Sequence, residues 1–192
     1  MKTILKILLV AVCVAGVLNW EYFWKNLSFT LNPAQIRIDA MEGAKGEKGE
    51  SNRLEILSLG IAAPIVYPEK NEEAAYQEAL IAGVAHYPGT ALPGEPGNVY
   101  IFGHSSDYLW RPGDYKTVFA LLPRIKIGAE IILTNSLGKN FHYKVTSSFA
   151  VGAGEVKWLD QGDYQKKLLT LQTSYPVGTA LRRWIVRAEL SP

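Results

Sequence analysis

The sequence predicts a mostly β domain, either a barrel or a sandwich, that carries one or two short helices. Several short apolar segments are separated by stretches rich in Gly, Pro, Asn and Ser, which is the pattern of strands joined by turns. Of the 192 residues, 48% are hydrophobic and 20% are charged, a composition typical of a folded core rather than of a disordered chain. The length suits one domain with an additional segment.

The expected strands are runs of apolar and β-branched residues that end at turn signals. Two of these runs flank the turn at 136–139 and therefore predict a hairpin. The stretch 87–98 holds three prolines and three glycines, so we expect a loop there. In chain order the expected strands are 54–59, 63–67, 99–103, 130–134, 141–145, 168–174 and 183–189.

Two short helices are expected between the strands. The first covers residues 72–82, with acidic residues in its first turn, Asn71 as the N-cap and Gly83 as the stop signal. The second covers residues 116–122 and ends at Pro123, which cannot continue a helix. Both are short, so the strands are expected to supply most of the core.

The N-terminal segment is apolar and predicts a membrane anchor. Residues 7–20 carry no charge, lysines at positions 2 and 6 precede them, and an aromatic cluster follows at 20–24. Aromatic rings favour the membrane–water boundary, and no clear cleavage site follows the apolar run. We therefore expect an uncleaved signal-anchor transmembrane helix over residues 1–24, with the N-terminus cytoplasmic and the remainder outside. A cleaved signal peptide is the alternative.

A solvated linker is expected after the anchor. Residues 39–53 read DAMEGAKGEKGESNR, in which charges alternate, glycine recurs and almost nothing apolar is available to bury. Its two or three Gly-x-y triplets are too few for a collagen triple helix. We assign residues 25–52 to a stalk and residues 53–192 to the folded domain.

Charge and cysteine content exclude several classes of protein. The net charge is only +2, so the chain lacks the basic footprint of a nucleic-acid-binding protein. Cys13 is the only cysteine, which excludes an intrachain disulfide and a multi-cysteine zinc site. Its place in the apolar N-terminal run also argues against a cysteine enzyme. Carboxylates are scattered along the domain, so we expect no metal and no cofactor.

Three polar residues stand at the ends of expected strands. His104 follows one apolar strand, Ser174 closes another, and Arg183 opens the last. A strand end on a rigid scaffold is where a side chain is presented to a cleft. Each residue also has an ordinary structural explanation, namely a turn for His104 and Ser174 and a surface ion pair for Arg183. Composition alone leaves these alternatives open.

Two motifs favour the functional explanation. Pro-Gly-x-x-Gly-Asn-x-x-x-x-Gly-His occupies 93–104, and Thr-Leu-Gln-Thr at 170–173 directly precedes Ser174. Together with the apolar N-terminus, the stalk and the β-rich domain, these motifs make the chain similar to the sortases, the membrane-anchored cysteine transpeptidases of bacterial surfaces. The resemblance covers 54–190 and implies a closed β-barrel of about eight strands with short helices. The short connection at 175–181 looks more like class D or E than class A.

The resemblance implies a role for each candidate residue. In the family, a cysteine after the Thr-Leu-x-Thr motif attacks the threonine carbonyl of a Leu-Pro-x-Thr-Gly-type (LPXTG) sorting signal, and an amine then takes the acyl group. His104 would be the general acid and base. Arg183 would hold the substrate carbonyl or the oxyanion, with Arg182 as the alternative although strand alternation turns it to the opposite face. Thr173 would help to position the substrate or the nucleophile.

The same resemblance implies partners and a location. The partners are the sorting-signal peptide of a secreted surface protein, an amine nucleophile of the cell wall or of a pilin, and the membrane. The location is the bacterial cell membrane, crossed once, with the catalytic domain outside. Segment 151–167, which is polar and contains glycines, is a candidate for the specificity wall of the substrate groove.

The sequence departs from the sortase pattern at the nucleophile, where Ser174 stands in place of cysteine. A serine hydroxyl depends on an oriented general base, and no acid for His104 is evident, although Asp107 lies three residues on. We therefore expect the chain as written to be nearly inactive. Three explanations are open: an engineered Cys-to-Ser substitution, a natural serine-using peptidase or transpeptidase, and a natural pseudoenzyme that binds sorting signals.

Overall fold

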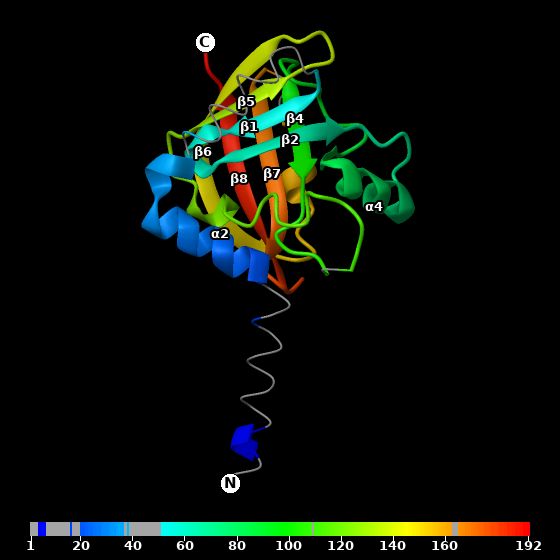
Figure 1. The fold of residues 1–192 in the computed structure, drawn as a ribbon. Helices are drawn as coiled ribbons and strands as arrows, with labels where there is room; N and C mark the ends of the chain where they lie inside the picture. Colours follow the sequence, from blue (N-terminus) through cyan, green and yellow to red (C-terminus); the bar gives the residue numbers. More distant parts are fainter. Residues whose placement is uncertain are drawn as a thin grey trace.

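A closed barrel of eight strands forms the centre of the computed structural model, which describes residues 4–6, 16, 20–36, 38, 51–108, 110–162 and 165–192 (Figure 1). The strand order is β1-β2-β3-β4-β7-β8-β6-β5, and β5 pairs back to β1. Of the two expected folds, the barrel is confirmed and the sandwich is wrong. The strands are β1 (Arg53–Ile56), β2 (Ile61–Val66), β3 (Val84–His86), β4 (Gly97–Phe102), β5 (Glu130–Thr134), β6 (Asn140–Gly152), β7 (Lys167–Tyr175) and β8 (Arg182–Leu190).

The barrel interior is filled by alternate residues of the strands. In β2 the side chains of Ile61, Ala63 and Ile65 are buried and their neighbours are only partly so, as the period of two requires. Tyr143 of β6 and Phe119 are the largest fully buried side chains. Each aliphatic side chain buried in this way stabilises the fold by about 1.5–3 kcal/mol, so the barrel provides most of the stability.

Several strands differ in extent from their prediction. The run at 54–59 is divided: β1 ends at Ile56, and a 3-10 helix η1 (Leu57–Leu59) turns the chain through Gly60, whose φ of +65° is left-handed. β3 was not predicted, because three residues are too few for a pattern. β4 begins inside the turn-rich stretch, and β6 continues to Gly152, past a bulge between Val145 and Ser147.

The first expected helix is confirmed as α4 (Glu73–Ala82), and its stop at Gly83 is correct. Gly83 donates its N–H to the carbonyl of Ala79, and a Cβ there would lie 2.3 Å from the carbonyl oxygen of Pro64. The proposed N-cap is wrong. Glu72 occupies that position without a side-chain cap, and Asn71 instead accepts a hydrogen bond from the Tyr76 hydroxyl.

The helix expected at 116–122 is wrong. The segment is a series of turns closed by hydrogen bonds between residues three apart, and it runs into a 3-10 helix η2 (Leu122–Arg124) that contains Pro123. The N–H of Phe119 donates to the carbonyl of His104, 2.9 Å away, instead of to a carbonyl one helical turn back. Tertiary pairing with the segment after β4 therefore replaces the helix.

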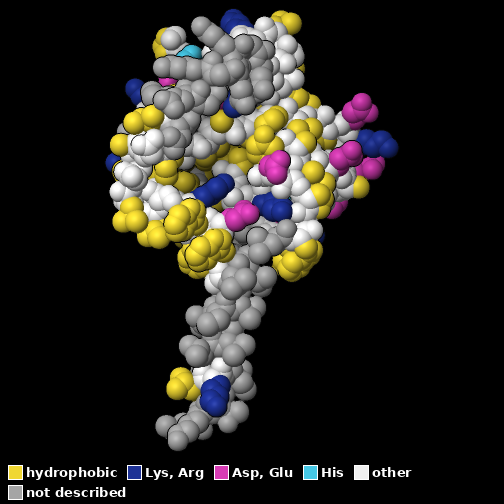
Figure 2. Space-filling view, viewed as in Figure 1, with side chains coloured by type: hydrophobic (Ala, Val, Ile, Leu, Met, Phe, Trp, Pro, Cys, Tyr) yellow, Lys and Arg dark blue, Asp and Glu magenta, His cyan; other side chains and the backbone are white. Residues whose placement is uncertain are grey.

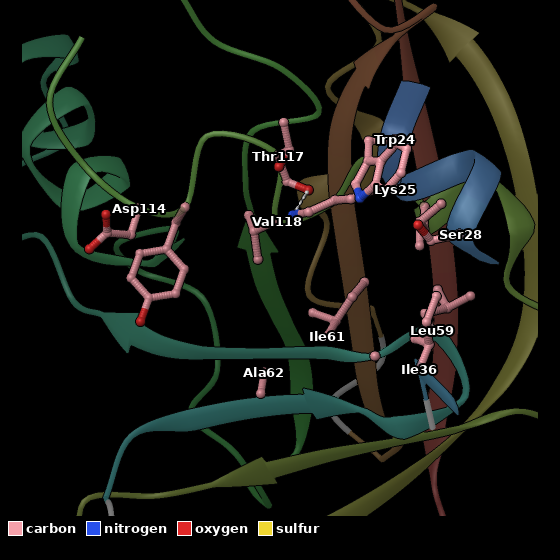
Figure 3. Close-up of a pocket in the computed structure, with 13 residues that line it drawn as sticks. Trp24, Lys25, Ser28, Ile36, Leu59, Ile61, Ala62, Asp114, Thr117 and Val118 are labelled. Carbon is pink, nitrogen blue, oxygen red and sulfur yellow. Dashed lines mark hydrogen bonds between the residues drawn. The ribbon is translucent and has the colours of Figure 1, made fainter. Parts of the chain in front are cut away.

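An N-terminal helix, α2 (Trp20–Leu31), lies against the side of the barrel. The boundary expected between anchor and stalk at residues 24 and 25 falls inside this helix. Lys25 donates to the carbonyl of Thr117 at 3.3 Å, Arg124 donates to the hydroxyl of Thr30 at 3.0 Å, and Phe29 packs on the core. Figure 3 shows the Lys25 contact beside the pocket that remains between α2 and the barrel.

The membrane anchor and the linker fall largely outside the described residues, because most of 1–19 and all of 39–50 are not among them. In the part of the chain that the structure does describe, none of the helices combines the length and the apolar character needed to cross a membrane.

Candidate active site

The motif residue His104 is brought beside the end of β7 by parallel pairing of β4 with β7. The two strands are in register from Gly97 opposite Lys167 to Phe102 opposite Gln172. Beyond them, the N–H of Gly103 donates to the carbonyl of Gln172 at 3.1 Å. The two strands therefore deliver the ends of both sequence motifs to the same edge of the barrel.

Thr173 holds the ends of β4 and β7 together through a buried hydrogen bond. Its side chain is buried, and its hydroxyl donates to the carbonyl of Gly103 at 2.8 Å. This hydrogen bond joins the residue before Ser174 to the residue before His104. Thr173 thus orients the backbone that carries both candidate residues, while it also borders the cavity described next.

Ser174 and Arg183 are direct partners across the antiparallel pair β7 and β8. Residues opposite each other in such a pair point to the same face of the sheet, so both side chains face one cavity. Nη1 of Arg183 donates to the carbonyls of Ala180 and Arg182, at 3.0 and 3.1 Å, which holds the guanidinium against the loop between the strands.

The side chain of Arg182 points to the opposite face of β8 from that of Arg183, as strand alternation predicts. It is paired with Tyr175 across the strands, is exposed, and donates to the carbonyl of Ala150 at 3.1 Å. It is not among the residues that border the cavity with Arg183. The structure therefore separates the two arginines and places Arg183 at the site.

The cavity has a volume of about 410 Å³ and brings His104, Thr173, Ser174 and Arg183 together. The cavity is bordered by α4 and by the connection between β6 and β7, including the 3-10 helix η3 (Lys157–Leu159). The expected specificity wall at 151–167 thus borders the site through four residues: Ala153, Glu155, Val156 and Leu159.

The lining of the cavity includes a polar pair that the sequence did not single out. The hydroxyl of Tyr100 in β4 donates to Oε1 of Gln172 in β7 at 2.6 Å, and both residues border the cavity. Burial raises the pKa of Tyr100 above its ordinary value, so the phenol stays protonated and remains a donor. The position of Gln172 within the Thr-Leu-Gln-Thr motif is the sequence signal that could have indicated this pair.

Asp107 points back to His104, which the sequence could not show. Its Oδ2 lies 3.7 Å from Nε2 of His104, and its Oδ1 lies 3.6 Å from Nε of Arg111. Burial lowers the pKa of His104, the Asp107 charge opposes that shift, and the Arg111 charge adds to it. The net result is a His104 imidazole that is neutral near pH 7, as a general base must be.

The other histidines have structural surroundings. His86 is buried and pairs through Nε2 with the carbonyl of Ala91 at 2.9 Å, and burial lowers its pKa. His142 is on the outside and lies 3.0 Å from Glu130. Among the described residues, no three His, Cys, Asp or Glu side chains gather closely enough to hold a metal ion.

Comparison with known proteins identifies the family of this barrel and site. A sequence model of the Sortase domain matches residues 54–191. The chain belongs to the sortase family. Sortase D of Bacillus subtilis (strain 168) is 29% identical to it over 146 residues, which are 74% of this chain and 65% of that protein. The match therefore covers less than two thirds of the relative, and it is consistent with a class D/E-like sortase.

Solved sortases have the same fold. Sortase C1 of Streptococcus suis superposes with a TM-score of 0.62 at 20% identity, over 81% of this chain and 80% of the other. Sortase C of Clostridium perfringens, solved with the C-terminal cell wall sorting motif, gives 0.60 at 25% identity, over 86% and 88%. These matches show that the eight-stranded barrel of this chain has the sortase fold.

Proposed function

We propose that this sortase domain, with cysteine at position 174, cleaves an LPXTG-type sorting signal after its threonine and transfers the acyl group to an envelope amine. The amine belongs to the cell wall or to a pilin. The observation that carries the proposal is the cavity shared by Ser174 and Arg183, which are paired across β7 and β8, and by His104. In support, the Clostridium perfringens sortase C was solved with a cell wall sorting motif.

The proposed reaction uses each residue at a defined step. The nucleophile at position 174 gives its proton to His104 and bonds to the threonine carbonyl carbon, whose oxygen becomes an oxyanion held by Arg183. The carbon–nitrogen bond then breaks, and His104 passes the proton to the departing glycine amine. The incoming amine attacks the acyl-enzyme and gives its proton to His104, which returns it to the leaving residue at position 174.

With Ser174 the proposed rate is low. A thiol is intrinsically far more nucleophilic than a hydroxyl, and it ionises at lower pH. Serine at position 174 therefore raises the activation barrier for attack on the threonine carbonyl. We propose that Ser174 stands where the family's cysteine belongs, with an engineered Cys-to-Ser substitution as the first explanation. A sorting-signal-binding pseudoenzyme is an alternative that keeps the cavity and its walls.

The serine-using alternative gains support from one contact. A serine triad needs a carboxylate beside the histidine, and Asp107 lies 3.7 Å from Nε2 of His104. In such a triad the other ring nitrogen, Nδ1, has to receive the proton of Ser174. The alternative therefore predicts turnover by the chain as written that disappears when Asp107 is replaced by Asn.

The experiment compares the chain as written with its Ser174→Cys variant on a sorting-signal peptide and an amine acceptor. The proposal expects kcat/KM to rise by about 100-fold or more with cysteine, because a reactive thiolate replaces a hydroxyl that needs full base assistance. Turnover by serine that cysteine does not improve would support the serine enzyme. Binding of the peptide without turnover by either protein would support the pseudoenzyme.

We further propose that residues 1–24 anchor the protein as a single-pass protein of the bacterial cell membrane, with the aromatic cluster at 20–24 at the membrane–water boundary, residues 25–52 as the connecting segment and the domain outside. The uncharged run at 7–20 and the preceding lysines support this orientation. Fractionation of cells that express the full chain, followed by protease treatment of intact spheroplasts, tests it. Protection of residues 53–192 from protease would contradict the orientation.

A further inference from the structure

Helix α2 carries its apolar face on the outside, which is the reverse of an ordinary surface helix. Five large apolar residues are between 49% and 72% exposed, at spacings of three, four, seven and eleven residues, which fall on one side of a helix. We call this set the outer face: Trp20, Phe23, Trp24, Leu27 and Leu31, of which Trp24 also borders the pocket between α2 and the barrel (Figure 3). Figure 2 shows hydrophobic side chains gathered along the lower left edge, where α2 lies in Figure 1.

The opposite side of α2 is held by the barrel, so the outer face cannot turn inward. Phe29, on the side away from the outer face, packs on the core, and the Arg124 guanidinium lies 5.5 Å from the centre of its ring. Lys25 is bonded to the carbonyl of Thr117. After α2, the side chain of Ile36, which Figure 3 labels, rests on Gly60. A Cβ added to Gly60 would lie 2.3 Å from that side chain.

We propose that the outer face of α2 lies on the surface of a lipid bilayer and holds the sortase domain against the membrane in one orientation. Two tryptophans and a phenylalanine are side chains that favour the headgroup region, and leucines extend the face along the helix axis. The uncharged run at 7–20 ends at Trp20, so in the sequence α2 lies directly beside the proposed anchor. The inference rests on the membrane attachment proposed above.

The same contacts connect α2 to the active site. Thr117, which accepts the hydrogen bond from Lys25, lies two residues before Phe119, whose N–H is bonded to the carbonyl of His104. A helix laid on the bilayer would therefore fix the height and direction of the cavity relative to the membrane surface. A domain on a solvated stalk would have no such fixed orientation.

The experiment uses the full chain with Cys13→Ala, reconstituted in vesicles of phosphatidylcholine and phosphatidylglycerol. Single cysteines are introduced by Phe23→Cys, Leu27→Cys and Leu31→Cys, and each is labelled with a bimane fluorophore. Quenching by lipids that carry a nitroxide near the headgroup is then measured. The control is Leu137→Cys, an exposed leucine in the turn between β5 and β6, away from α2 in Figure 1.

The proposal expects quenching at the three α2 positions to agree within about twofold, because a helix parallel to the surface keeps them at one depth. Quenching at Leu137 should be several times weaker. A helix standing upright places positions 23 and 31 about 12 Å apart in depth, so a steep fall in quenching between them would overturn the proposal. If the labels at the three α2 positions are shielded from water but not quenched by lipid, and energy transfer occurs between labelled copies, then a second chain covers the outer face.

Flotation of the protein with the vesicles is recorded in the same samples and separates the two proposals. Protein that fails to float refutes the membrane attachment itself, and the docked helix with it. Protein that floats but shows no lipid contact at Leu27 and Leu31 refutes only the docked helix. Neither readout uses catalysis, so the identity of residue 174 does not affect them.

Discussion

The charge of His104 is set by burial and by two neighbours of opposite sign. Asp107 raises its pKa and Arg111 lowers it, while burial provides the largest downward effect. Asp107 lies close to both basic side chains, 3.7 Å from Nε2 of His104 and 3.6 Å from Nε of Arg111. The pH dependence of the reaction is therefore the measurement that separates these contributions.

We predict that Asp107→Asn, made in the Ser174→Cys background, shifts the acidic limb of kcat/KM to lower pH. The neutral imidazole is the active base, and loss of the carboxylate charge lowers the pKa of His104 further, so the base form persists at lower pH. Arg111→Gln should shift the same limb to higher pH. Shifts in the same direction for both variants would show that the two side chains act only through structure.

Arg183 and Arg182 form a matched pair for testing the oxyanion contact. In the Ser174→Cys background, Arg183→Ala should lower kcat by about 100-fold or more, because a charged donor is lost where negative charge develops. Arg182→Ala should stay within about threefold, because its guanidinium faces Ala150 outside the cavity. Steady-state kinetics with the sorting-signal peptide measure both, and equal losses would contradict the assignment.

The sequence motifs were sufficient to predict which strand ends meet, but not how Asp107 is aimed. His104 and Ser174 lie at the ends of strands whose apolar runs and length can be read from residue types. Asp107 lies in the irregular segment after β4, where no periodicity sets side-chain direction. Its contact with His104 depends on the packing of that segment, which only the tertiary structure determines.

Among the structural elements, the wall of the cavity depends on a buried side chain of the first motif. Asn98 is fully buried in β4, and its amide donates to the carbonyls of Trp158 and Asp160 at 2.9 and 3.1 Å. Its oxygen accepts from the Thr170 hydroxyl at 2.8 Å. The connection between β6 and β7 is thereby tied to the pair of strands that carries the site.

We predict that Asn98→Ala lowers the free energy of unfolding by about 2–4 kcal/mol, because three hydrogen bonds are lost and buried partners remain unsatisfied. Thr170→Val removes only one of these bonds and should cost about 1 kcal/mol. Urea denaturation followed by circular dichroism gives both values. A cost for Asn98→Ala no larger than that for Thr170→Val would show that the wall is held by other contacts.

The exposed valine on this wall is expected to contact the substrate. Val156 borders the cavity although it is 70% exposed, so its side chain is available to a bound peptide. In the Ser174→Cys background, Val156→Ala should raise KM about fivefold with kcat unchanged, which corresponds to ~1 kcal/mol of lost apolar contact. Leu137→Ala, an exposed residue in the β5–β6 turn, is the control and should leave KM unchanged.

Long periodic elements were predictable, whereas elements defined by tertiary pairing were not. The α4 helix and the final two strands follow the expected residue ranges closely. β3 is only three residues long and exists because β2 and β4 pair with it on either side. The segment 116–122 looked helical by composition, but its backbone forms turns and bonds to the carbonyl after β4.

For the molecule as a whole, the least predictable feature was the attachment of α2 to the barrel. The aromatic cluster of α2 predicts a membrane interface. Nothing in that pattern predicts that Phe29, in the same helix, packs on the folded domain. The residues that bond to α2 are Thr117 and Arg124, far along the chain. Closure of the barrel brings these segments together, so the contact exists only in the complete fold.

The closed barrel should nevertheless fold without α2, since every strand of the ring and nearly all of its buried core lie after residue 51. We predict that a chain of residues 51–192 unfolds in one cooperative transition and is less stable than the full chain by about 1–2 kcal/mol, the contribution of a partly buried Phe29. In the Ser174→Cys background it should cleave a soluble sorting-signal peptide with an unchanged kcat, because all cavity residues are retained. Differential scanning calorimetry and peptide cleavage test these two points. A broad transition, or a loss of activity with the barrel intact, would mean that α2 is part of the cooperative unit that shapes the active site.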